Sequence, residues 1–240
     1  MNLSVLTNGH NGANGKVSES STPAEILDWT LHRFAGQNIV ATSAFGMEGC
    51  ALVDMLAKRA ERFTVIYLDT HFLFPETLEL RDRLAACYPN VAFVNRGTTL
   101  TPERQAEIYG DRLWERDPDQ CCKLRKVDPM ADALKGVDVW VTALRRGQSE
   151  TRKNLRVVDW DWQYELLKVS PLASWTRKDV WAYIQAHDVP YNPLHERGYP
   201  SIGCTHCTKP VEGATVTDYS RSGRWTGTGK TECGLHGYGI

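Results

Sequence analysis

The sequence predicts a single α/β domain built on a doubly wound, mostly parallel sheet. Short apolar runs alternate with amphipathic segments along the chain, which is the order expected of strands and helices in such a fold. One run, Phe63–Leu68, is almost wholly apolar, as expected for a strand that helices cover on both faces. No internal repeat or interdomain linker interrupts the 240 residues. A chain of this length can bury roughly three quarters of its unfolded surface in one domain.

The first half of the predicted domain begins with a helix. Thr22 is a favoured N-cap residue, Pro23 suits the first helical position and Glu25 the acidic first turn, so this helix is predicted to run to Phe34. A loop of small residues, Ser43–Gly49, is predicted to join the first strand to the second helix. The other elements expected here are strands over 37–42, 63–68 and 91–94 and helices reaching residue 59, over 75–88 and within 101–116.

The second half continues the alternation and then loses it. Strands are predicted over 137–143 and 166–169, and helices over 129–134 and 178–187. From residue 208 the chain is rich in Gly, Thr and Ser without apolar periodicity, so 208–240 is expected to be a mobile arm rather than core. Residues 1–22 are expected to be a disordered lead-in, which leaves 23–207 as the domain.

Composition excludes several functions. The formal net charge is −1, so we expect no nucleic-acid partner. The sequence contains no run of eighteen apolar residues, so we expect no membrane span. The first residues lack the apolar core of a signal peptide, and we expect a cytoplasmic protein. In the reducing cytosol, seven cysteines favour metal binding or catalysis over disulfides. Cys50 and Cys87 lie in apolar stretches and are expected to be small buried side chains.

Two further patterns suit an anionic ligand. The loop Ser43–Gly49 would place unpaired N–H groups at a helix start, where anions bind, and Asp69 follows the next strand at the edge where α/β sheets bind nucleotides. Three arginines, Arg145, Arg146 and Arg152, follow a later strand and suit phosphate or sulfate. Each pattern has an ordinary alternative: a glycine loop without ligand, a turn residue, and a solvated basic loop.

Four cysteines form a plausible ligand set. The adjacent pair Cys121 and Cys122 can face one cofactor at a helix end, and Cys204 and Cys207 have the spacing of a thiolate pair. Zinc sites ordinarily use two Cys-x-x-Cys pairs, so the sequence favours a [4Fe–4S] cluster over zinc or redox-active thiols. Lys126 and Arg125 would offset the charge of the cluster.

Cys233 is a candidate nucleophile on the Gly-rich tail. His236 and Lys230 could lower the pKa of its thiol, whereas the adjacent acid Glu232 would act in the opposite direction. Arg221 and Arg224 of the same tail could close over an anionic substrate together with the Arg145–Arg152 loop. The alternative is a cysteine without function near a chain end.

These motifs together resemble the assimilatory adenylyl-sulfate and phosphoadenylyl-sulfate reductases. The resemblance covers about residues 25–240, and its specificity comes from the joint order of four motifs. They are Cys121-Cys122-x-x-Arg125-Lys126-Val-x-Pro129, Leu144-Arg-Arg-x-Gln148-Ser-x-Thr-Arg152, Ser201-Ile-Gly-Cys204-x-x-Cys207-Thr and Glu232-Cys-Gly-Leu-His236.

The resemblance implies an adenine-nucleotide α-hydrolase-like (PP-loop, Rossmann-like) fold and a reductase of sulfate assimilation and cysteine biosynthesis. Cys233 would attack the sulfur of adenylyl sulfate, release AMP and become an S-sulfocysteine, from which thioredoxin or glutaredoxin frees sulfite. The cluster would tune the site and would not donate electrons; a homo-oligomer is possible. The residues implied in substrate binding are Ser43, Phe45, Gly46, Asp69, Lys126, Arg145, Arg152, Arg221, Arg224 and His236.

The cysteine pairs bear on the substrate. In this family, members with both pairs resemble the [4Fe–4S] type that mostly uses adenylyl sulfate, and some also accept the 3′-phosphorylated form. The loop Ser43–Gly49 lacks the Ser-Gly-Gly-x-Asp-Ser of ATP-using relatives, which argues against ATP cleavage.

Three hypotheses from other classes stay open on sequence alone. They are an ATP-dependent thiolase acting on tRNA, a non-enzymatic iron–sulfur or zinc-binding regulatory protein, and a dithiol oxidoreductase using Cys204 and Cys207.

Overall fold

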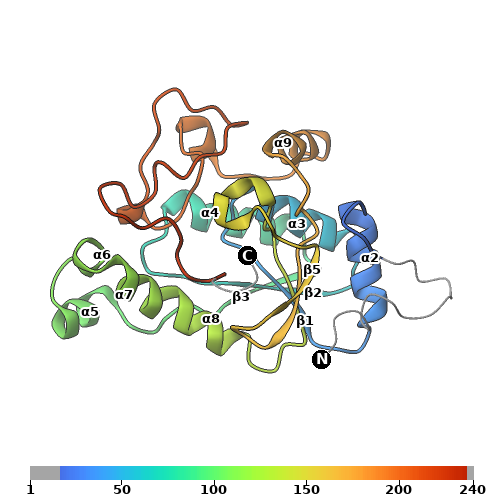
Figure 1. The fold of residues 1–240 in the computed structure, drawn as a ribbon, viewed down its shortest axis with the longest axis horizontal. Helices are drawn as coiled ribbons and strands as arrows, with labels where there is room; N and C mark the ends of the chain where they lie inside the picture. Colours follow the sequence, from blue (N-terminus) through green and yellow to red (C-terminus); the bar gives the residue numbers. More distant parts are fainter. Residues whose placement is uncertain (1–16, 237–240) are drawn as a thin grey trace.

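The computed structural model describes residues 17–236 and confirms one mostly parallel α/β sheet with helices around it (Figure 1). The strand order is β3-β2-β1-β4-β6-β5, and every pairing is parallel except that of β5 with β6. The strands are β1 (Ile39–Thr42), β2 (Phe63–Tyr67), β3 (Val91–Asn95), β4 (Val139–Val141), β5 (Val158–Asp161) and β6 (Leu166–Val169). The sequence predicted all of them except β5, the antiparallel edge strand.

The helices lie close to their predicted positions. A capping box between Thr22 and Glu25 starts the first one, as expected. The polar stretch 101–116 resolves into two short helices, and the helix predicted from residue 129 is the end of a longer helical run that begins at Pro118. The helices are α2 (Pro23–Arg33), α3 (Met47–Ala57), α4 (Pro75–Cys87), α5 (Pro102–Tyr109), α6 (Leu113–Arg116), α7 (Pro118–Cys122), α8 (Asp128–Ala133) and α9 (Arg177–Ala186).

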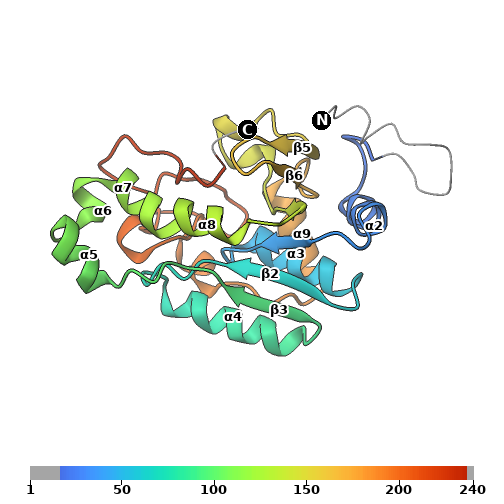
Figure 2. The same ribbon diagram turned by 90° about the horizontal axis from the view of Figure 1, so that it is seen from below.

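The central strands are buried on both faces because their side chains alternate between two apolar layers. On one face Ala41, Val65 and Val141 pack in a cluster with α3. On the other face Val40 and Trp140 pack in a cluster with α8. Figure 2 shows α8 and α4 on opposite sides of the sheet. The helices therefore leave the carboxyl edge of the sheet as the place where a ligand can enter.

The side of the sheet to which the chain adds strands changes between β1 and β4. The strands β2 and β3 extend the sheet on one side of β1, whereas β4 pairs with its other side. Such a switch point leaves a crevice at the carboxyl ends of the two strands. The loop Ser43–Gly46 follows β1 and the arginine-rich loop follows β4, so both predicted anion-binding segments meet at this crevice.

The segment predicted to be a mobile arm, as far as residue 236, lies across this carboxyl edge (Figure 1). Trp225 N donates to Cys207 O at 3.0 Å, and Lys209 N donates to Gly223 O at 2.8 Å. Trp225 is 4% exposed and packs with the cysteines of the domain, so the expectation that the arm stays out of the core is wrong for this residue. Whether the arm moves stays a prediction.

The predicted lead-in lies mostly outside the described residues. Residues 1–16 are not described, but 17–22 form a turn whose Glu19 carboxylate accepts from Val157 N at 3.1 Å. These six residues are therefore placed against the domain, which differs from the predicted disorder.

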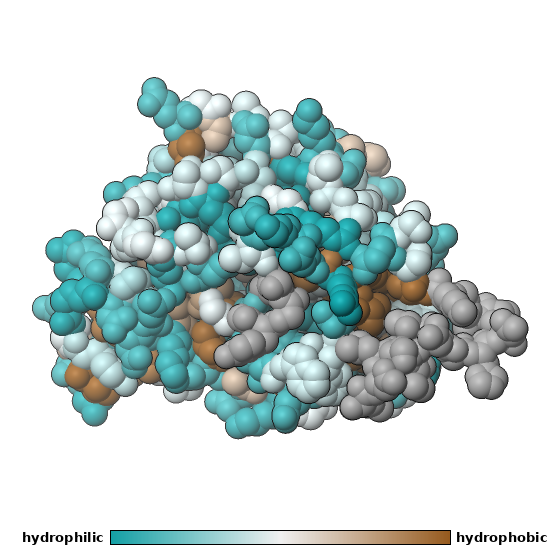
Figure 3. All heavy atoms as spheres, viewed as in Figure 1, coloured by the Kyte–Doolittle hydropathy of each residue, from teal (hydrophilic) through white to brown (hydrophobic). Residues whose placement is uncertain are grey.

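The surface seen in Figure 3 is predominantly hydrophilic, with apolar side chains in small separate groups. Among the described residues, Trp162 is the most exposed large apolar side chain, at 69%. No helix within residues 17–236 is long and apolar enough to cross a bilayer. Cys87 is exposed at the end of α4, which corrects its predicted burial, whereas Cys50 is buried as predicted.

Candidate active site

The loop after β1 forms one wall of a cavity at the switch point. Gly46 is the N-cap of α3 and has no side chain with which to cap the helix, so N–H groups of the first turn can face a ligand. Ser43 Oγ accepts from Phe45 N at 3.0 Å and fixes the turn. Phe45 is buried in the left-handed region (φ 57°), an unfavourable conformation for such a residue. A Cβ at Gly49 would lie 2.5 Å from Ser43 Oγ, so only glycine lets α3 start this close to the loop.

A buried charged cluster supports this loop from below. Glu48 Oε1 accepts from Arg145 Nη2 at 2.6 Å and from Arg177 Nη1 at 3.1 Å. Burial acts to raise the pKa of Glu48, but Arg177 and Arg145 outweigh it and lower the pKa to about 2. Arg145, predicted to bind substrate, is thus engaged by Glu48 and is not among the residues that line the cavity. Glu48 and Arg177 do line it.

Three further arginines come from two separate segments. Arg152, from the arginine-rich loop, is almost fully buried and donates to Gln148 Oε1 at 2.6 Å. Arg221 and Arg224 come from the arm, and Arg224 stacks over Trp225 at 4.5 Å. A Cβ at Gly203 would lie 2.2 Å from Arg224 Nη2, so this glycine makes room for the guanidinium. Together with Arg177, these three arginines line one cavity of about 240 Å³.

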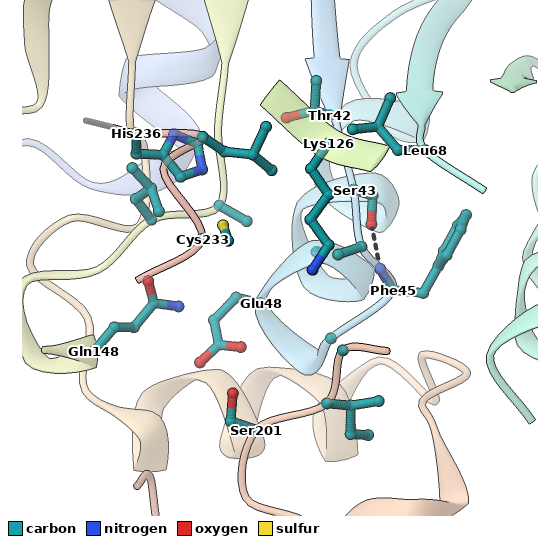
Figure 4. Close-up of a pocket in the computed structure, with 18 of the residues that line it drawn as sticks. Thr42, Ser43, Phe45, Glu48, Leu68, Lys126, Gln148, Ser201, Cys233 and His236 are labelled. Atoms are coloured by element: carbon teal, nitrogen blue, oxygen red, sulfur yellow. Dashed lines mark hydrogen bonds between the residues drawn. The ribbon is translucent and has the colours of Figure 1, made fainter. Parts of the chain in front are cut away.

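Cys233 reaches the same cavity from the arm. Figure 4 shows Cys233, Lys126 and Glu48 around one hollow, each carried by a different segment. Lys126 is buried; desolvation acts to lower its pKa, but the surrounding thiols of Cys204, Cys122 and Cys233 raise it. An ammonium group that keeps its proton beside Cys233 stabilises a thiolate.

His236 lines the cavity next to Cys233 but is not a cation. It stacks on Trp140 at 5.0 Å between ring centres. Burial and then the nearby charge of Lys168 lower its pKa well below the usual value. A neutral imidazole can accept or donate a hydrogen bond, but it does not supply the positive charge expected of it from the sequence.

The four predicted ligand cysteines line a second, small cavity beside the first. Cys121 and Cys122 end α7, where the helix passes into a π-helical turn, Lys123–Val127. Cys204 and Cys207 flank a single 3₁₀ turn on the opposite side. Lys126 lines both cavities and so lies between the cysteines and Cys233.

The cysteine cavity has the chemistry of a site for an anionic metal cluster. Arg125 donates to Thr70 O at 2.8 Å, but its buried Nη2 has no partner. Burial and the neighbouring thiols raise the pKa of Cys121 to about 12, and burial and Cys204 raise that of Cys207 to about 11. Burial opposes a thiolate at Cys204 too, yet Lys126 and Thr70 lower its pKa.

The donor set fits a cluster in which each thiolate binds a different iron. Among the described residues, no three His, Cys, Asp or Glu side chains converge closely enough to hold one metal ion. The four thiols instead surround a common volume, with Lys126 and the Arg125 guanidinium, whose Nη2 has no hydrogen-bond partner among residues 17–236, beside it to balance negative charge.

Asp69 is the other predicted site residue that does not line the cavity. Its carboxylate accepts from His71 N at 2.8 Å, and its N–H donates to Asn95 Oδ1 at 3.1 Å. These contacts are those of a turn residue, the alternative considered for it. Of the predicted site residues, those that line the main cavity are Ser43, Phe45, Gly46, Lys126, Arg152, Arg221, Arg224, Cys233 and His236, together with Cys204.

Several lining residues were not predicted from the sequence. Glu48 is in an ordinary acidic first turn, and His195 and Arg177 belong to no motif considered. Only the structure marks them, by their burial at the cavity, and a buried polar atom without a partner costs about 1–3 kcal/mol. Four residues of the cavity carry such an atom: Arg152 Nε, His195 Nε2, Trp225 Nε1 and His236 Nδ1. Unsatisfied polar atoms around one cavity indicate a polar ligand.

Comparisons with known proteins agree with this geometry. Residues 38–210 match the phosphoadenosine phosphosulfate reductase domain. The chain is 47% identical over 212 residues to the adenosine 5′-phosphosulfate reductase of Lysinibacillus sphaericus, which covers 88% of this chain and 89% of the relative. It is also 47% identical over 221 residues to the phosphoadenosine 5′-phosphosulfate reductase of Gloeobacter violaceus, covering 91% and 90% of the two chains.

Solved structures give the same result. The phosphoadenylyl-sulfate reductase of Candida auris in its phosphate complex superposes with a TM-score of 0.68 at 33% identity, covering 80% of this chain and 91% of that one. The FMN adenylyltransferase of Candida glabrata shares only the fold, with a TM-score of 0.58 at 13% identity over 88% of this chain and 73% of that one.

Proposed function

The chain belongs to the phosphoadenosine phosphosulfate reductase family, and from that premise we propose that it reduces adenylyl sulfate to sulfite and AMP. The observation that carries the proposal is the placement of Cys233 at a cavity lined by Lys126 and four arginines. Such a cavity suits a substrate with two adjacent anionic groups, a phosphate and a sulfate.

The chemistry divides into two steps. The Cys233 thiolate attacks the sulfur of adenylyl sulfate, the bond from sulfur to the bridging oxygen breaks, and AMP leaves with that oxygen. The product on the protein is S-sulfocysteine. A dithiol protein, thioredoxin or glutaredoxin, then supplies two electrons, releases sulfite and becomes a disulfide. Lys126 supports the thiolate, and Arg152, Arg221 and Arg224 hold the anion.

We further propose that Cys121, Cys122, Cys204 and Cys207 hold a [4Fe–4S] cluster. When bound, the cluster would supply a compact anionic centre behind Lys126. The protein would fix the position of Lys126 between that centre and Cys233, since Lys126 lines both cavities.

The test of the reaction is sulfite release in the presence of thioredoxin, with anaerobically purified protein. Adenylyl sulfate and its 3′-phosphorylated form are compared side by side. We expect a strong preference for adenylyl sulfate, the substrate named for most of the similar relatives. Preference for the phosphorylated form would favour the alternative substrate, for which the relative from Gloeobacter violaceus is named. No sulfite from either would contradict the proposed reaction.

Two cysteine variants separate the roles of the two sites. Cys233→Ser should abolish sulfite release and retain iron, because Cys233 lies outside the four-cysteine cavity. Cys121→Ser should lose iron and visible absorbance, because it removes one of the four ligands.

Wild-type protein given adenylyl sulfate without thioredoxin should gain one sulfonate mass on Cys233. That mass on another cysteine, or unchanged iron in Cys121→Ser, would refute the corresponding role.

A further inference from the structure

The carboxylate of Glu232 is held by four donors from two segments of the chain. Its Oε2 is 2.9 Å from Arg152 Nη2 and 3.2 Å from Arg221 Nη2. Its Oε1 accepts from Ser149 Oγ at 2.9 Å and from Thr151 Oγ1 at 3.3 Å. The next residue along the chain is Cys233. A side chain adjacent to the nucleophile therefore ties the arm to the arginine-rich loop.

The same two arginines are those expected to hold the substrate anion. A carboxylate at 2.9 Å and 3.2 Å cancels much of the positive potential that the pair offers to another anion. The pair is also shielded from water: the side chains of Arg152, Arg221 and Glu232 are 6%, 16% and 23% exposed. Removing one partner of such a shielded pair therefore has a larger effect than it has at an exposed surface ion pair.

We propose that Glu232 is a positioning residue that occupies Arg152 and Arg221 from within the chain and so keeps the arm closed with Cys233 at the cavity. The phosphosulfate group of the substrate competes with Glu232 for these arginines. This inference rests on the proposed function for the identity of the competing anion. The closing of the arm itself requires no substrate.

The first test measures arm opening by hydrogen–deuterium exchange without substrate. Glu232→Gln keeps the shape of the side chain and removes its charge. The amide of Trp225 reports docking because it donates to Cys207 O of the domain. Trp225 precedes residue 232, so its intrinsic exchange rate does not change. We expect exchange in the peptide that contains it to rise roughly five- to tenfold.

Two controls isolate this effect. Glu150→Gln removes an exposed charge from the arginine-rich loop, where Glu150 pairs with Lys153, and should leave exchange of the arm unchanged. Peptides of β1 and β4 should exchange as in the wild type, which separates arm opening from general unfolding. Unchanged exchange of the arm in Glu232→Gln would overturn the proposal.

The second test measures the competition. Cys233→Ser cannot react, so adenylyl sulfate stays intact in a calorimetric titration. Adding Glu232→Gln to this background should tighten binding by about threefold or more, because the arginines lose their internal anion. Equal or weaker binding would overturn the competition.

Sulfite release by the wild type is measured separately. If the wild type releases no sulfite while the arm of Glu232→Gln exchanges faster, the proposed function is refuted and the closing role of Glu232 stands.

Discussion

At the residue scale, His195 shows how burial prepares a side chain for a ligand. Its Nδ1 lies 2.7 Å from the Tyr199 carbonyl oxygen, which can only accept, and 3.3 Å from Arg177 Nη2, which can only donate. The shorter contact assigns the proton to Nδ1, and Nε2 is then an acceptor at the cavity without a partner among residues 17–236. Burial, and then the charge of Arg177, lower the pKa of His195 to about 4. The residue is therefore neutral at pH 7 and ready to accept a hydrogen bond.

This shift predicts an acid-sensitive fold. Between pH 6.5 and about 4 the unfolded chain binds a proton at His195 that the native protein does not, so stability falls as the pH falls through this range. The Tm of the wild type should fall between pH 7 and pH 5. In His195→Gln this fall in Tm should be smaller than in the wild type by roughly 3–6 °C.

The measurement is calorimetric unfolding of both proteins at pH 7 and pH 5 without oxygen. His32→Gln, which changes an exposed histidine of α2, should keep the wild-type pH dependence. An equal loss in His195→Gln and the wild type would contradict the assignment.

At the element scale, one local irregularity positions a residue of the site, and a second lies at the edge of the sheet. The π-helical turn Lys123–Val127 follows directly after the two cysteines of α7 and carries Lys126 between the two cavities. A regular α-helix would displace each later side chain by a fraction of a turn. The edge strand β5 joins β6 by an antiparallel pairing, and a buried ion pair crosses it.

That ion pair is a stability prediction. Lys168 Nζ lies 2.8 Å from Asp161 Oδ2, with both side chains at most 2% exposed. Burial lowers the pKa of Lys168, and Asp161 opposes that shift. Asp161→Asn leaves a buried cation unpaired and should cost about 2–4 kcal/mol of unfolding free energy.

Denaturant unfolding measures this cost. Asp132→Asn breaks an exposed ion pair with Lys135 and should produce no measurable change. If Asp161→Asn loses as little unfolding free energy as this control, then water reaches the ion pair between Lys168 and Asp161.

At the scale of the whole molecule, the arm lines the main cavity and packs against the residues of the second one. Trp225 packs with Phe72 and three of the proposed ligand cysteines, Cys122, Cys204 and Cys207, while it also lines the main cavity. The segment that carries the proposed nucleophile therefore also packs over the proposed cluster site.

We expect Trp225→Ala to expose the cluster to oxygen. Loss of visible absorbance in air should be several-fold faster than in the wild type, because the variant removes the apolar cover of three ligands. Trp162→Ala, which removes an exposed tryptophan from the turn between β5 and β6, is the matched control and should not change the rate. Equal rates in Trp225→Ala and the wild type would mean that another part of the chain protects the cluster.

The sequence by itself determined the fold class and the family. Apolar periodicity locates the central strands because each is buried on both faces, and the cysteine and arginine motifs are local in the chain. Their order made the four cysteines and Cys233 candidates for the proposed chemistry, and in the structure the four cysteines line one cavity and Cys233 lines the cavity beside it.

Only the tertiary structure decided which charged residues face the cavity. Arg145 and Arg152 come from one loop, yet Arg145 turns inward to Glu48 and Arg152 lines the cavity. The strand β5 was missed because an edge strand lacks the doubly apolar pattern of the central strands. In the sequence Glu232 is notable only as the neighbour of Cys233, whereas in the structure its carboxylate has four partners, from residues 149–152 and 221. The partners at 149–152 lie about 80 residues from Glu232, so these pairings depend on three-dimensional packing, which no local pattern specifies.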